Sequence, residues 1–296
     1  MLWEQDVGSS NLSTPTTPNT GVATSRQNVS RVIGRLLNLL TAARPATSDE
    51  TARLRKLYLD LLENCLIGLI YEDPGRTPAG EIYDPQLREF GRDWPSQAHS
   101  MIGGRRIRNL RTLVEQVLHD RIPGDFIETG VWRGGACIYM RGILHAFSEQ
   151  GRCVWVADSF AGLPPPDPER YPADAGDKHH TIKQLAIPLE TVKSNFAKYG
   201  LLDEQVRFLP GWFKDTLPTA PIGQLALMRL DGDMYQSTIE ALTQLYAKLS
   251  PGGFVIIDDY KAVPCRKAVE DFRASIGTEE EIHRIDHTGV FWRKYG

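Results

Sequence analysis

The sequence predicts an α/β protein built on a mostly parallel β-sheet that is covered by helices and ends in an antiparallel hairpin. Three observations support this fold class. From residue 125 onward, short apolar runs alternate regularly with stretches in which apolar residues recur at helical spacing. A turn, His287-Thr288-Gly289, separates two β-like runs at the end of the chain, 281–286 and 290–294. Acidic residues and glycines also gather where the runs end, which is where open α/β sheets bind their ligands.

Length and composition limit the classes of protein and of partner that the chain can represent. The chain has 296 residues, of which 41% are hydrophobic, enough to form one large globular domain. The net charge of -3 gives no argument for binding nucleic acid or an anionic membrane. The four cysteines show no CxxC spacing and indicate reduced thiols in a cytoplasmic protein. No apolar run approaches the about 18 residues of a membrane span, so we expect neither a membrane nor a nucleic acid as partner.

The N-terminal part is expected to be mostly disordered over residues 1–45. Residues 1–30 are dominated by Ser, Thr, Asn, Pro and Gly and offer little to bury. Residues 31–44 have the pattern of a short amphipathic helix, which Pro45 interrupts.

A helical and lid region is expected over residues 46–120. Thr47 and Glu50 form a capping-box pattern ahead of a helix over 51–71. Its wide apolar face must pack on the main domain or on a second subunit. Residues 73–97 are rich in proline, glycine and charge and are interpreted as a surface loop that acts as a lid, before a helix over 105–119.

The expected core spans residues 121–296. Its strands are predicted over 125–129, 153–158, 206–209, 225–230 and 254–257, and its helices over 136–148, 237–250 and 266–275. In the second of these helices, Ser237 and Glu240 match a capping box, and Pro251-Gly252-Gly253 ends the helix.

A glycine-rich turn joins the first strand to its helix, with the sequence Glu128-Thr129-Gly130-Val131-Trp132-Arg133-Gly134-Gly135. Glycines there let a ligand approach the backbone, and the helix start offers free N–H groups. An acid inside the turn, Glu128, would repel a pyrophosphate but suits the cationic amino-acid part of S-adenosylmethionine. Asp158 ends the second strand, the position of an acid that pairs with ribose hydroxyls. The bland alternative is that both acids are solvated strand ends.

Four further acids follow two expected strands: Asp231 and Asp233 after the fourth, and Asp258 and Asp259 after the fifth. Parallel neighbours would bring these strand ends to one rim, where four carboxylates favour a hard cation. On an extended segment Asp231 and Asp233 would point to the same side, whereas Asp258 and Asp259 would diverge unless the strand has already ended. The competing interpretation is an ordinary turn and an ordinary loop. The residues alone do not divide the roles of the four acids.

Five motifs in order closely resemble the macrocin O-methyltransferase family. They lie at residues 128–135, 157–164 (ADSFAGLP), 209–213 (LPGWF), 230–238 (LDGDMYQST) and 257–260 (IDDY). The resemblance runs from about Leu54 to the end of the chain. It implies a class I methyltransferase (Rossmann-like) fold with a seven-stranded sheet, N-terminal helices and lid loops, usually as a homodimer. It also implies S-adenosyl-L-methionine- and Mg²⁺-dependent methylation of a sugar hydroxyl on a small-molecule glycoside in antibiotic biosynthesis.

The resemblance further implies site roles. Asp231, Asp258 and Asp259 would ligate the metal, and Asp233 would be the general base. The residues expected to bind the cofactor are Glu128, Gly130, Asp158, Ser159, Trp212, Met101 and Ile102. Trp212 lies where the family contacts adenine, and Met101 with Ile102 would close over the cofactor, although each of these could instead be packing.

Residues 162–180 are too polar and proline-rich for a regular element and form a second expected lid. Its His179-His180 pair is a poor zinc site, and its role stays open between substrate contact and a solvated loop, as does that of His99. Two other functions remain open: a catechol-type O-methyltransferase acting on a phenol, and a nucleoside-binding domain without catalysis. The sequence does not identify the acceptor.

Overall fold

The computed structural model describes residues 47–77 and 80–296 of the chain. The chain divides into two units, residues 1–51 and residues 52–296. The expected disordered extension and the helix over 31–44 lie outside the described residues. In the described part of the first unit, the Glu50 N–H donates to Thr47 Oγ1 at 3.2 Å, which is one half of the expected capping box.

The predicted α/β fold is confirmed. Seven strands form the main sheet in the order β6-β5-β4-β7-β8-β10-β9. They are β4 (Asp125–Thr129), β5 (Val154–Asp158), β6 (Val206–Pro210), β7 (Leu225–Leu230), β8 (Leu249–Ile257), β9 (His283–Arg284) and β10 (Val290–Arg293). The first five are parallel, and β10 pairs antiparallel with β8 and β9. The chain runs outward from β4 through β5 and β6, then returns to the other side of β4 with β7. The carboxyl end of β4 therefore faces the crevice where ligands bind in such sheets.

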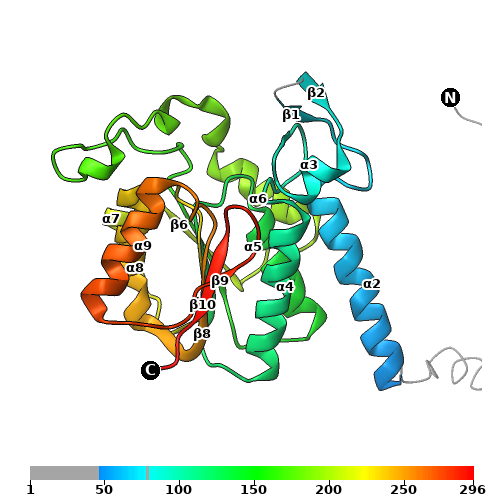
Figure 1. Ribbon diagram of the computed structural model, residues 1–296. Helices are drawn as coiled ribbons and strands as arrows, with labels where there is room; N and C mark the ends of the chain where they lie inside the picture. The colour runs from blue at the N-terminus through cyan, green and yellow to red at the C-terminus, as the bar shows by residue number, and fades with distance from the viewer. Residues whose placement is uncertain (1–46, 78–79) are drawn as a thin grey trace, which may run out of the picture. The chain divides into compact units, whose positions relative to one another are not determined.

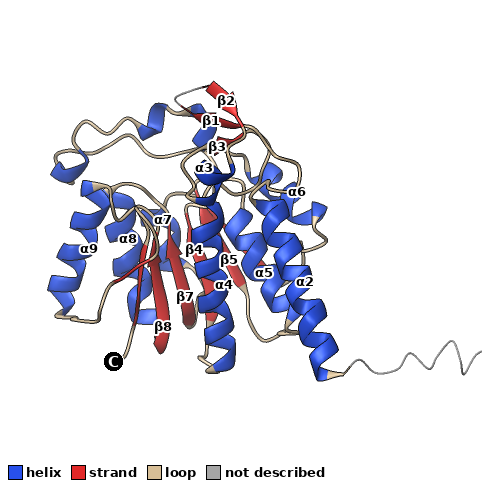
Figure 2. Cartoon of the chain, turned by 45° about the vertical axis from the view of Figure 1, so that its right-hand side comes forward, coloured by secondary structure: helices blue, strands red, loops and turns tan. Residues whose placement is uncertain are grey.

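Helices cover both faces of the sheet (Figures 1 and 2). One face packs against α2 (Ser48–Leu66), α4 (Gly103–His119), α5 (Gly135–Ala146) and α6 (Leu189–Lys198), and the other against α8 (Tyr235–Leu245) and α9 (Val263–Ile276). Neighbouring strand residues alternate between the two cores, since Phe126 joins the first and Ile127 the second. A short helix, α7 (Phe213–Thr216), follows β6. Among the described residues, no helix is long and apolar enough to span a membrane.

The expected capping box of α8 is wrong. The helix begins at Tyr235, and Met234 before it provides no side-chain cap. Instead Asp174 accepts hydrogen bonds from the N–H groups of Tyr235 (2.7 Å) and Gln236 (2.9 Å). The cap comes from a distant loop, which local sequence cannot reveal.

The end of α8 was also predicted too late. The helix stops at Leu245, a 3₁₀ turn covers Tyr246–Lys248, and β8 already begins at Leu249. The residues expected to end the helix, Pro251-Gly252-Gly253, lie inside the strand, where its register with β7 shifts. Gly252 has a φ of 86°, and a Cβ on Gly253 would lie 2.8 Å from the Ala226 carbonyl oxygen. These glycines permit an irregular strand.

The segment 73–97 is not only a surface loop. It contains β1 (Gly75–Thr77), β2 (Gly80–Ile82), α3 (Pro85–Glu89) and β3 (Trp94–Pro95), and its strands pair in the order β2-β1-β3. The fully buried Arg88 holds it together by donating to Asp93 and to the carbonyl oxygens of Ile67 and Asp73. Two of its charges, Arg88 and Asp93, are not solvated but pair with each other in the interior. The helix expected to reach residue 71 ends at Leu66, before Gly68 with φ 71°.

Candidate functional site

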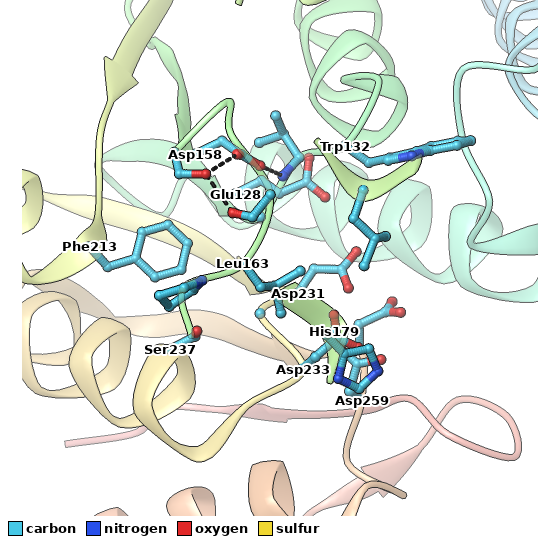
Figure 3. A pocket seen from close by; sticks show the side chains of 18 of the residues that line it. Glu128, Trp132, Asp158, Leu163, His179, Phe213, Asp231, Asp233, Ser237 and Asp259 are labelled. Atoms are coloured by element: carbon cyan, nitrogen blue, oxygen red, sulfur yellow. Dashed lines mark hydrogen bonds between the residues drawn. The ribbon is translucent and has the colours of Figure 1, made fainter. Parts of the chain in front are cut away.

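A cavity of about 670 Å³ lies at the carboxyl ends of the parallel strands. Every site residue predicted from the sequence lines it, namely Met101, Ile102, Glu128, Gly130, Asp158, Ser159, Trp212, Asp231, Asp233, Asp258 and Asp259. Figure 3 shows Asp158 and Glu128 toward one end of the cavity, Asp233 and Asp259 toward the other, and Asp231 between them. Residues up to 158 positions apart in the sequence (259 − 101) are thus brought to one chamber.

Three acids converge closely enough to share a cation. Asp231, Asp258 and Asp259 each offer a carboxylate oxygen, and these oxygens lie within 4.8 Å of one another. The parallel pairing of Leu230 with Ile257 produces this convergence, because the acids follow these two residues directly. Strand β8 ends at Ile257, so Asp258 and Asp259 are not forced to opposite faces.

The electrostatics of the acids favour a cation. Asp259 Oδ2 is buried and has no hydrogen-bond partner among the described residues. Burial raises the pKa of Asp259 well above its usual value, and the charges of Asp233, Asp231 and Asp258 raise it further. A divalent cation would supply the missing partner and offset the repulsion. Oxygen-only donors of this kind suit Mg²⁺, so the residues fit that ion.

Two buried arginines hold the acids in place. Arg229 of β7, 1% exposed, donates to Glu128 and Asp258 and, at 2.6 Å, to Asp231. Arg106 of α4 donates to Asp258. Sequence reasoning missed both residues. For Arg229 the available signal was its place as a lone arginine within the apolar run LALMRL, where a charge is unexpected without a partner.

Asp233 occupies a strained turn. It was expected to share one side of an extended segment with Asp231, but that expectation is wrong because β7 ends at Leu230 and Asp233 has a φ of 59°. Non-glycine residues rarely adopt this left-handed conformation, and such strain concentrates at functional sites. Burial raises the pKa of Asp233 to about 7, the charge of Asp231 adds to the shift, and His179 opposes it. A carboxylate with that pKa can accept and release a proton near neutrality.

The glycine turn fits closely against the acids. Gly130 has a φ of 84°, and a Cβ there would lie 1.8 Å from the carbonyl oxygen of Asp231, so only glycine is tolerated. Glu128, 2% exposed, accepts a hydrogen bond from the Cys137 thiol, with Sγ 2.9 Å from Oε2, and pairs with Arg229. Burial raises the pKa of Glu128 to about 7, although Arg229 opposes the shift. This carboxylate therefore lies under the turn and lines the cavity.

Asp158 organises the turn from β5. Its carboxylate accepts hydrogen bonds from the N–H groups of Val131 and Phe160, each at 2.7 Å. Burial raises its pKa, while these hydrogen bonds oppose the shift. Ser159 donates to the Gly162 carbonyl at 2.6 Å. Both residues thus shape the loop as well as line the cavity.

The histidines separate into different environments. His179 lines the cavity, whereas His180 is exposed and does not. His99 also lines the cavity, with Nδ1 2.7 Å from the Tyr199 hydroxyl oxygen. Burial lowers the pKa of His99 to about 4, with a further contribution from the nearby Lys198 charge. His99 is therefore neutral at physiological pH.

Comparison with known proteins identifies relatives over most of the chain. The family model Macrocin-O-methyltransferase (TylF) matches residues 75–294. A demethyldecarbamoylnovobiocin O-methyltransferase from Streptomyces niveus is 51% identical over 257 residues, covering 84% of this chain and 97% of that protein. An 8-demethyl-8-(2,3-dimethoxy-alpha-L-rhamnosyl)-tetracenomycin-C 4'-O-methyltransferase from Streptomyces olivaceus is 54% identical over 249 residues, covering 82% and 94%. A mycinamicin III 3''-O-methyltransferase from Micromonospora griseorubida is 51% identical over 246 residues, covering 81% and 96%.

Solved structures agree. The O-methyltransferase NovP superposes with a TM-score of 0.79 at 51% identity, covering 82% of this chain and 100% of that one. The calicheamicin methyltransferase CalS11 superposes with a TM-score of 0.51 at 17% identity, covering 64% of this chain and 78% of that one, a likeness of fold alone. The sheet described above is thus shared with class I O-methyltransferases.

Proposed function

The chain belongs to the macrocin O-methyltransferase family and is an O-methyltransferase, and from that premise we propose its substrates and chemistry. It transfers the methyl group of S-adenosyl-L-methionine to a sugar hydroxyl of a glycosylated natural product, assisted by Mg²⁺, in antibiotic biosynthesis. The observation that carries the proposal is the cluster of Asp231, Asp258 and Asp259 in the same cavity as the glycine turn and Asp233.

The cofactor is proposed to lie along the glycine turn. Glu128 and Gly130 contact its methionine part, directly or through water, and Asp158 with Ser159 binds the ribose hydroxyls. Trp212, ahead of α7, contacts the adenine. Met101 and Ile102, immediately before α4, close over the cofactor. The support is that all seven residues line one cavity at the sheet's switch point.

The acceptor is proposed to lie at the acidic end of the cavity. A hydroxyl is a poor nucleophile while it holds its proton, so its oxygen must lose the proton as it attacks the sulfonium methyl carbon. The new carbon–oxygen bond replaces the carbon–sulfur bond, and S-adenosyl-L-homocysteine leaves. Asp231, Asp258 and Asp259 would hold Mg²⁺, which when bound lowers the pKa of a neighbouring hydroxyl and orients it. Asp233 accepts the proton, and its pKa of about 7 suits that role.

The test is a substrate panel with S-adenosyl-L-methionine and Mg²⁺. The glycosides are the acceptors that the relatives' names give, among them demethyldecarbamoylnovobiocin and mycinamicin III, and simple catechols are the competing class. Mass spectrometry should find one added methyl group on the sugar of at least one glycoside. Turnover of catechols alone would replace the sugar proposal with the phenolic one. Cofactor binding without transfer to any acceptor would support a non-catalytic domain.

We further propose that the protein acts as a homodimer in the cytoplasm. Leu54, Leu57 and Leu61 of α2 are each more than half exposed, with 57%, 54% and 56% of their surfaces accessible. A second copy would cover this apolar stripe. The four free cysteines are compatible with a reducing compartment. Light scattering after size-exclusion chromatography tests the dimer, and a wild-type protein that stays monomeric at micromolar concentration would contradict it.

A further inference from the structure

One histidine of the lid faces the reaction chamber, and its orientation is fixed. Nδ1 of His179 lies 2.6 Å from Asp177 Oδ2, and Asp177 Oδ1 accepts the His179 backbone N–H at 2.8 Å. Because a carboxylate only accepts hydrogen bonds, the ring proton lies on Nδ1 in this pair. Nε2 is then the ring atom available to a molecule in the cavity that His179 lines.

The lid segment that carries this histidine is tied to the turn that carries Asp233. The buried Asp174 accepts the N–H groups of Tyr235 and Gln236, the first two residues of α8, which begins two positions after Asp233. The Tyr171 ring also packs on the Tyr235 ring, with centroids 6.0 Å apart. These contacts hold the lid segment beside the turn of Asp233, and Figure 3 shows the His179 and Asp233 side chains at the acidic end of the cavity.

The two side chains also interact electrostatically. Burial lowers the pKa of His179, but the Asp177 hydrogen bond and the charges of Asp233 and Asp177 raise it by more, so the net shift is upward. The oriented His179 imidazole therefore lies near Asp233, and it belongs neither to the acids proposed to bind the cation nor to the residues proposed to bind the cofactor. A polar group in that place lines the part of the cavity where the acceptor is proposed to bind.

We propose that His179, oriented by Asp177, is an acceptor-binding residue whose Nε2 hydrogen-bonds a second oxygen of the sugar, next to the hydroxyl that is methylated. This inference rests on the proposed function and specifies its acceptor, a ring with neighbouring oxygens. Asp177 is a positioning residue, since it acts through the imidazole. The reacting hydroxyl itself lies at Asp233.

The test compares His179→Gln with His180→Gln, a matched control because His180 is the adjacent, exposed histidine of the same loop. The probe is the glycoside of the panel above that the wild-type protein methylates fastest. His179→Gln should raise the KM for this acceptor about tenfold with a smaller change in kcat, since a hydrogen bond kept from ground state to transition state is lost. Asp177→Asn should raise the KM less, because the ring remains, and His180→Gln should match the wild type.

Calorimetry and a trimmed acceptor complete the test. His179→Gln should bind S-adenosyl-L-methionine and Mg²⁺ as the wild type does. Removing the sugar oxygen next to the methylated hydroxyl should raise the KM of the wild type for the acceptor, but it should raise the KM of His179→Gln little further. Equal kinetics for the His179 and His180 variants would overturn the inference, and a loss of cofactor or Mg²⁺ affinity would assign His179 to those ligands instead. If the wild-type protein methylates no glycoside, the proposed function fails, and this inference fails with it.

Discussion

Arg229 is the residue whose removal tests the charge balance of the site most sharply. Its guanidinium group, 1% exposed, is shared by Glu128, Asp231 and Asp258, of which the first and last are 2% and 3% exposed. We consider Arg229→Met, which keeps an unbranched apolar side chain in the strand but removes the charge. The three carboxylates would then lose a common partner in a region that water hardly reaches.

The size of the effect follows from this geometry. Removing one member of a buried ion pair costs about 3–5 kcal/mol, and here one cation serves three acids. We therefore expect a loss of at least about 3 kcal/mol in the free energy of unfolding, a large part of the about 5–15 kcal/mol that a typical domain has. Added Mg²⁺ should restore part of the lost free energy of unfolding, because a cation at Asp231 and Asp258 replaces part of the positive charge.

Urea unfolding followed by circular dichroism in EDTA measures this, since urea is uncharged and does not screen the pairs. The control is Arg266→Met on α9, whose pair with Glu270 at 3.8 Å is exposed on both sides. That variant should lose less than about 1 kcal/mol. Equal losses for the two variants would refute the view that Arg229 holds the acids together, and so would an Arg229 loss that Mg²⁺ leaves unchanged.

Three further predictions concern the same cavity. Asp233→Asn should bind S-adenosyl-L-methionine normally in calorimetry but lower kcat at least about a hundredfold, and a fully active variant would remove Asp233 as base. Asp158→Asn should weaken cofactor binding about tenfold, and an unchanged Kd would count against the ribose contact. In EDTA, Glu128 should stabilise the fold less as the pH rises from about 4 to about 7, because folded Glu128, with its pKa of about 7, holds a proton that the unfolded chain releases. The measure is the unfolding free energy of the wild type minus that of Glu128→Gln, which should fall across this window. A rise across this window would contradict the pKa shift.

The convergence of the acids was predictable because it depends on topology. Parallel strands end at one edge, so acids directly after two neighbouring strands must meet, and the structure brings Asp231, Asp258 and Asp259 together in that way. The glycine turn was predictable from its place between a strand and a helix. The sequence did not reveal that Gly130 lies against the backbone of Asp231, where no larger residue fits.

Features that depend on long-range pairing could not be predicted. Asp174 caps α8 from 61 positions away, so the prediction of a capping box from the local pattern of Ser237 and Glu240 was wrong. The local sequence around Arg88 and Arg229 does not indicate their partners. Both are buried, and their ion pairs form only in the folded chain. His179 and His180 are adjacent in the sequence, and only the fold of the loop distinguishes them.

The central claim is cation-assisted methyl transfer to a sugar hydroxyl by this cavity. The most direct measurement supplies S-adenosyl-L-methionine with an isotopically labelled methyl group, one glycoside acceptor of the panel, and either EDTA or Mg²⁺. The account predicts that the label reaches the sugar fragment with Mg²⁺ and that EDTA abolishes the transfer until Mg²⁺ is restored. Transfer that proceeds equally in EDTA, or a label found only on the aglycone, would contradict it.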